Sequence, residues 1–169
     1  NPGHAKRVLL PKDYYALQQA VPELIGIKTA AGDKIWFNEM RKYQHGLAIF
    51  IQGHRLATGI KQQVAHGSYS NMACFNPFGA VRWYQLMLED IEEALYIEEK
   101  IMLFLETCIL PFSKNGYSDT ALDKLLAFAG NWSNLTTRLK WPYKGVSTDE
   151  ACKIRDTAKR MLPEILTKI

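Results

Sequence analysis

The sequence is poor in the features that usually announce an active site. It contains three cysteines, Cys74, Cys108 and Cys152, which are far apart and form no CxxC pair and no Cys/His cluster of zinc-finger spacing. This excludes a disulfide scaffold and favours a reducing, cytoplasmic compartment. No apolar run approaches the roughly 18 residues that a membrane span needs, so no contact with a membrane is expected. The chain begins at Asn1 and not at a methionine, so a preceding segment stays open.

Catalytic and cofactor motifs are also missing. The chain has no Gly-x-Ser-x-Gly, no phosphate-binding Gly-x-x-x-x-Gly-Lys-Ser/Thr, no Gly-x-Gly-x-x-Gly and no Glu-x-x-His. Glu92, Glu99 and Glu106 are spaced by seven residues, as on a solvated helix face. We therefore expect no metal, no cofactor and no catalytic residue. A dispersed active site stays an alternative, in which Glu98 would meet one of three histidines, His45, His54 and His66.

The chain is unevenly charged. The net charge of +4 combines +5 over residues 1–66, −5 over residues 67–137 and +4 over residues 138–169. Basic ends and an acidic middle indicate an anionic partner, or the packing of one copy of the chain on another.

Hydrophobic spacing and turn residues predict a mainly α protein. Residues 24–37 alternate apolar side chains around Ala30-Ala31-Gly32-Asp33, which predicts a small β-hairpin. Helices are expected over 38–65, 77–110, 120–141 and 148–169, with Asn76-Pro77 and Ser147 as start signals. Pro163 is expected to bend or break the last of them. Three glycines inside 38–65 (Gly46, Gly53 and Gly59) indicate close approach of another helix, or a break near Gly53. The predicted architecture is a single domain, 1–169, built as a four- to five-helix bundle-like fold with a small N-terminal hairpin.

Basic and aromatic side chains alternate near the C-terminal end. Lysine and arginine bind phosphate by charge, and exposed aromatic rings stack on bases. The expected nucleic-acid-binding residues are Arg138, Lys140, Trp141, Tyr143, Lys144, Lys153, Arg155, Lys159 and Arg160.

The segment from Asn76-Pro77-Phe78-Gly79 through Trp83 and Leu86 to Ile91-Glu92-Glu93-Ala94-Leu95 resembles a motif in small helical proteins of integrating conjugative elements and conjugative plasmids. Its spacing is about one helical turn longer here. Some members are regarded as transcriptional regulators, so the resemblance implies a mobile-element protein acting on DNA or on a DNA-bound partner.

These patterns together favour a non-enzymatic regulatory or accessory protein that binds nucleic acid, with DNA as the favoured partner. The hairpin could pair with a second copy, giving a homodimer. The alternative is an assembly subunit without nucleic-acid contact, in which the acidic middle of one copy docks on the basic end of another. In place of nucleic acid, the basic ends would then bind an acidic protein surface.

Overall fold

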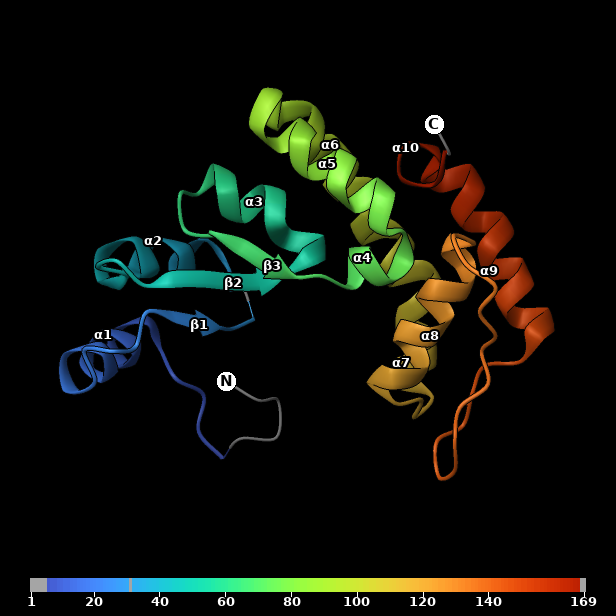
Figure 1. The fold of residues 1–169 in the computed structure, drawn as a ribbon, viewed down its shortest axis with the longest axis horizontal. Helices are drawn as coiled ribbons and strands as arrows, with labels where there is room; N and C mark the ends of the chain where they lie inside the picture. Colours follow the sequence, from blue (N-terminus) through green and yellow to red (C-terminus); the bar gives the residue numbers. More distant parts are fainter. Residues whose placement is uncertain (1–5, 31, 168–169) are drawn as a thin grey trace. The chain divides into compact units, whose positions relative to one another are not determined.

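The computed structural model describes residues 6–30 and 32–167, in two compact units that divide after Tyr69. In the first unit, helices and strands alternate: α1 (Pro11–Ala20), β1 (Gly26–Lys28), α2 (Lys34–Tyr43), β2 (Ala48–Gln52), the 3-10 turn η1 (Gly53–Arg55), α3 (Leu56–Lys61) and β3 (Gly67–Tyr69). The strands form a parallel sheet in the order β1-β2-β3 (Figure 1). Each strand is joined to the next through a helix, as parallel pairing requires.

The expected helical bundle with a β-hairpin is therefore wrong. The first half of the expected hairpin is β1, but the second half is the first turn of α2, because Asp33 caps a helix there: its carboxylate accepts a hydrogen bond from the Trp36 amide at 2.9 Å. Phe37 and Met40 then fall one turn apart and are both buried. Strand β1 pairs with β2, a segment that the sequence predicts as helix.

The expected continuous helix over 38–65 is also wrong. Helix α2 ends at Tyr43, and the backbone turns at His45 and Gly46, whose φ angles are +26° and +84°. Glycine adopts the second of these without strain. After strand β2, helix α3 packs so closely on the sheet that a Cβ at Gly59 would lie 2.5 Å from Ile51 Cδ1. The glycine thus serves the contact of a helix with a strand and not of two helices.

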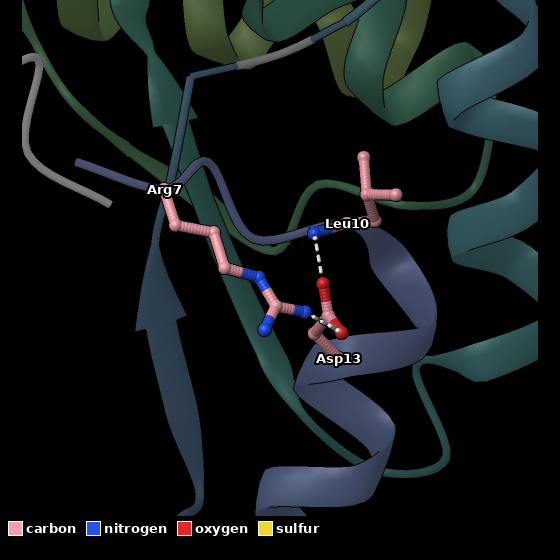
Figure 2. A network of polar contacts seen from close by, with 3 residues as sticks. All are labelled: Arg7, Leu10 and Asp13. Carbon is pink, nitrogen blue, oxygen red and sulfur yellow. Dashed lines mark hydrogen bonds and ion pairs between the residues drawn. The ribbon is translucent and has the colours of Figure 1, made fainter. Parts of the chain in front are cut away.

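Helix α1 begins where proline and a local cap place it. Pro11 has no amide hydrogen to leave unpaired in the first turn. The Asp13 carboxylate accepts the Leu10 amide at 2.8 Å and pairs with the Arg7 guanidinium at 2.8 Å (Figure 2). One carboxylate therefore closes the helix start and holds the preceding segment.

The core of the first unit lies between the sheet and its helices. It contains Tyr14, Phe37, Met40, Leu47, Ile49, Ile51 and Val64. Ile49 and Ile51 alternate along β2 and are both fully buried, so one face of the strand is covered.

The second unit is helical: α4 (Asn71–Phe75), α5 (Pro77–Glu89), α6 (Ile91–Phe104), the π-helical turn η2 (Leu105–Ile109), α7 (Leu110–Lys114), α8 (Asp119–Gly130), α9 (Thr148–Met161) and α10 (Pro163–Leu166). The Asn76 and Ser147 side chains cap α5 and α9 as the sequence predicts. Phe75 stacks on Phe104 with ring centroids 5.5 Å apart, inside the core of this unit.

Three predicted helices of this unit need correction. The helix over 77–110 is interrupted at Asp90, whose side chain caps α6 by accepting the Glu92 and Glu93 amides. The helix over 120–141 stops at Gly130, followed by Asn131 in the left-handed conformation. The helix over 148–169 breaks before Pro163, and residues 168–169 lie outside the described part. The single-domain organisation stays a prediction.

Candidate functional site

The carboxyl ends of the three strands bring together side chains that are far apart in sequence. Parallel strands all end at the same edge of a sheet, and that edge is where ligands bind in α/β folds. Strand β1 ends at Lys28, β2 at Gln52 and β3 at Tyr69. In register, Lys28 lies beside Phe50, and Gln52 lies beside Tyr69. This edge is the candidate functional site.

The site lies on the sheet face opposite the buried one. Phe50 falls between Ile49 and Ile51, so its ring points to the other face, where it is 41% exposed. The ring leans over β3, because a Cβ at Gly67 would lie only 2.8 Å from Phe50 Cε1. Lys28 is in register with Phe50 and is also exposed. We call this surface, made by Lys28, Phe50, Gln52 and Tyr69, the lysine face.

The Lys28 amine does not extend freely into solvent. Its Nζ lies 4.0 Å from the centroid of the Tyr69 ring. The Tyr69 hydroxyl donates a hydrogen bond to the Thr29 carbonyl at 3.3 Å. Burial raises the pKa of the Tyr69 phenol. The phenol is therefore neutral at pH 7, and the ring faces the amine as an uncharged aromatic surface.

Thr29 connects this face to the core. Its backbone amide donates to the Phe50 carbonyl at 3.0 Å and so extends the β1–β2 pairing past Lys28. Its hydroxyl donates to the Ala30 carbonyl at 3.2 Å, so the buried Tyr14 hydroxyl is the donor in the 3.1 Å bond to Thr29 Oγ1. Thr29 is thus held by a backbone hydrogen bond to β2 and by a side-chain hydrogen bond from α1.

The nine residues predicted to bind nucleic acid lie elsewhere, in the second unit. Arg138, Lys140, Trp141, Tyr143 and Lys144 lie in the segment between α8 and α9, and Lys153, Arg155, Lys159 and Arg160 lie on α9. Trp141 is 92% exposed and precedes a cis proline. The Lys144 amine lies over the Tyr117 ring at 5.0 Å.

Several of the basic groups on α9 have partners within the chain. The Arg155 guanidinium lies over the Phe128 ring at 5.2 Å and is partly buried. Lys159 pairs with Asp156 at 3.7 Å, and Arg160 donates to the Thr157 hydroxyl at 3.1 Å. Part of the basic character of this helix is therefore used in local contacts.

The alternative sites that the sequence left open gain no support. Among the described residues, no group of three or more His, Cys, Asp or Glu side chains could hold a metal ion. Glu98 is buried on α6, among the core residues of the second unit. No helix in residues 6–30 and 32–167 is long and apolar enough to cross a membrane.

Solved structures of lyases and aldolases share this fold. A prophage protein of the dihydrodipicolinic acid synthase family from E. coli K12, in complex with pyruvate, is 13% identical with a TM-score of 0.70, covering 90% of this chain and 51% of that chain. The N-acetylneuraminate lyase of Fusobacterium nucleatum is 18% identical with a TM-score of 0.70, covering 96% of this chain and 53% of that chain. A variant of the 2-keto-3-deoxygluconate aldolase of Sulfolobus solfataricus is 12% identical with a TM-score of 0.68, covering 90% of this chain and 50% of that chain. No family model and no curated protein matches the chain.

These similarities correct both the fold and the function expected from sequence. The chain has an α/β fold with a parallel sheet, similar to part of the TIM-barrel-like fold of these structures, and not a helical bundle with a hairpin. The expectation of a non-enzymatic, DNA-binding regulator is wrong, because the proteins that share the fold are enzymes of the lyase and aldolase type. The chain spans about half the length of those structures. The resemblance to conjugative-element proteins stays a prediction.

Sequence reasoning did not single out Lys28. One available signal was its place directly after the short apolar run Ile25-Gly26-Ile27, where a strand of a parallel sheet ends. The other was the alternation of short strands and helices over residues 26–69, which is typical of βα units. Both signals depend on recognising strands of only three to five residues.

Proposed function

We propose that the chain carries the lysine site of an aldolase-type enzyme that acts on 2-oxo acids through a Schiff base at Lys28. The observation that carries the proposal is the position of Lys28: an exposed amine at the carboxyl end of a parallel strand, on the face opposite the buried core. Support for the substrate class comes from the similar proteins, one of which is described in complex with pyruvate and another as a 2-keto-3-deoxygluconate aldolase.

A lysine amine is suited to this chemistry. In its neutral form, Nζ attacks the ketone carbon of the 2-oxo acid, and loss of water with uptake of one proton gives a protonated imine. The imine nitrogen draws electrons from the carbon chain, so the bond between the third and fourth carbons can break: the hydroxyl on the fourth carbon loses its proton to a base, an aldehyde leaves, and the electron pair moves to the nitrogen as a neutral enamine. A proton from water then returns to the third carbon and restores the imine. Water attacks the imine carbon, releases the 2-oxo acid and restores the amine, and the same steps in reverse form the bond.

The surroundings of Lys28 fit a small polar substrate with an apolar body. The Phe50 and Tyr69 rings provide apolar surface on β2 and β3, beside the amine. Gln52 lies two residues after Phe50 along β2, so its side chain is on the same face, and its amide can donate a hydrogen bond to a substrate carboxylate.

The cysteines Cys74, Cys108 and Cys152 are free thiols, in keeping with the predicted cytoplasmic location.

The experiment is chemical trapping of the imine. The full chain is incubated with pyruvate and sodium cyanoborohydride, which reduces the imine to a stable secondary amine. Intact-mass measurement should show one reduced pyruvyl group per chain, and peptide mapping should locate it on Lys28.

Two variants make the result specific. Lys28→Arg keeps the positive charge but is no nucleophile at neutral pH, so it should abolish the adduct. Lys34→Arg changes an exposed lysine at the start of α2 and should leave the adduct intact. An adduct spread over many lysines, or equal in both variants, or absent from the unmodified sequence, would show that Lys28 is not the nucleophile.

A further inference from the structure

The lysine face contains a contact that the placement of Lys28 alone does not explain. Lys28 belongs to β1 and Tyr69 to β3, with all of β2 between them. Lys28 is in register with Phe50, and Phe50 in turn with Gly67, so Tyr69 lies two residues further along β3. The lysine side chain thus crosses β2 diagonally, and its Nζ ends 4.0 Å above the Tyr69 ring.

This contact restricts where the amine can be. A lysine side chain has four rotatable bonds and loses much conformational freedom when it is held in one position. The face of an aromatic ring attracts an ammonium group, and the attraction falls away within a few ångströms of the ring centroid. The ring therefore selects the rotamers that keep Nζ over the end of the sheet.

The ring itself is anchored at its far end. The Tyr69 hydroxyl donates to the Thr29 carbonyl at 3.3 Å, and Thr29 follows Lys28 in the chain. The Tyr14 hydroxyl, from the buried side of α1, donates to Thr29 Oγ1 at 3.1 Å. A short chain of contacts thus runs from the core through Thr29 to Tyr69, and from the Tyr69 ring back to the Lys28 amine.

We propose that Tyr69 is a positioning residue: its ring holds the Lys28 amine at the edge of the sheet, and its hydroxyl fixes the ring through the Thr29 carbonyl. The inference rests on the proposed Schiff-base function, and it assigns to Tyr69 no contact with the reacting atoms. The ring makes the contact with the amine, and the hydroxyl keeps the ring in place.

Two substitutions separate the ring from the hydroxyl. Tyr69→Phe keeps the aromatic face and loses one neutral hydrogen bond, so the rate of imine trapping should stay within about fivefold of the unmodified chain. Tyr69→Leu removes the ring, and a misplaced nucleophile should react about a hundredfold more slowly. Tyr43→Leu, which removes an aromatic ring at the end of α2 that packs near Tyr15, is the matched control and should change neither measurement below.

The first measurement tests the contact without any substrate. Lysine amines are dimethylated with ¹³C-formaldehyde and a reductant, and the Lys28 resonance is assigned as the one that disappears in Lys28→Arg. Methyl groups above a ring face are shifted upfield by the ring current. The upfield shift should be present in the unmodified chain and in Tyr69→Phe, and absent in Tyr69→Leu.

The second measurement is the trapping rate with pyruvate, on unmethylated protein whose fold is checked by circular dichroism. A lost upfield shift together with a slow rate in Tyr69→Leu, and neither in Tyr69→Phe, supports the positioning role. Equal trapping rates in Tyr69→Leu and the unmodified chain would overturn it, as would an unshifted Lys28 resonance in the unmodified chain. If the shift is present but no variant forms an adduct, the proposed function fails and not the contact.

Discussion

Replacing Gly130 with alanine should destabilise the second unit, against the usual preference of helices for alanine. Gly130 is the last residue of α8 and is buried. A Cβ at this position would overlap the carbonyl oxygen of Phe75 at the end of α4. The neighbour is backbone and not a flexible side chain, so the two helices must move apart to accept the methyl group.

The expected loss follows from two opposing terms. Alanine in place of glycine raises the free energy of unfolding by up to about 1 kcal/mol in a helix interior, and by less at the last residue of a helix. Overpacking by one methyl group costs about 1–3 kcal/mol. The overlap with backbone favours the upper part of that range, so we expect a net loss of about 1–2 kcal/mol. For a chain of this size that lowers the melting temperature by roughly 2–8 °C.

The assay is urea unfolding of the full chain followed by helical circular dichroism. Gly130→Ser should lose more stability than Gly130→Ala, because the added atom extends the same overlap. Gly116→Ala is the control, because the φ angle of Gly116 is +80° and a Cβ there would meet nothing within 4 Å. It should lower the free energy of unfolding by about 1 kcal/mol through backbone strain alone. Gly116→Ser should lower it by little more than Gly116→Ala does. A Gly130→Ala chain as stable as the unmodified one would refute the close packing of α8 on α4.

Two further substitutions test other contacts. Tyr14→Phe removes the buried donor to the Thr29 hydroxyl and should cost about 1 kcal/mol in urea unfolding; an unchanged midpoint would show that the bond contributes nothing. In the second unit, burial tends to raise the pKa of Glu164, but its hydrogen bond to Lys100 is among the effects that lower it overall. Because the folded pKa is depressed, the stabilisation is present above the ordinary glutamate range and is lost as pH falls through the folded pKa. Lys100→Met should therefore lower the free energy of unfolding by less than about 1 kcal/mol near neutral pH, since both side chains are partly exposed. In strong acid it should not change the free energy of unfolding. A difference that is the same at all pH values would contradict this assignment.

The sequence is informative where a helix start depends on neighbouring residues. Asn76 caps α5 by accepting the Gly79 amide at 2.8 Å, and Ser147 caps α9 by accepting the Glu150 amide at 3.3 Å. A cap involves residues only two or three positions apart, so the pattern carries its own structure. Pro163 breaks the last predicted helix for an equally local reason, since a proline cannot continue it.

Strand β2 shows where local patterns mislead. Its five residues, Ala48–Gln52, contain Phe50 and Ile51, which also fit the helical spacing predicted over 38–65. A short apolar run cannot be assigned to a helix or a strand by periodicity alone. The parallel neighbours β1 and β3 decide the matter, because they supply the hydrogen bonds that β2 cannot make by itself.

The amino-acid sequence by itself determined the caps, the proline breaks and the uneven distribution of charge, because these depend on nearby residues or on composition. Only the tertiary structure decided that Lys28 and Tyr69, 41 positions apart, face each other at one edge of a sheet. That juxtaposition requires three strands to pair in parallel and in one register. A lysine at the end of a three-residue strand has no local signature, so its chemistry becomes visible only when the strands are placed side by side.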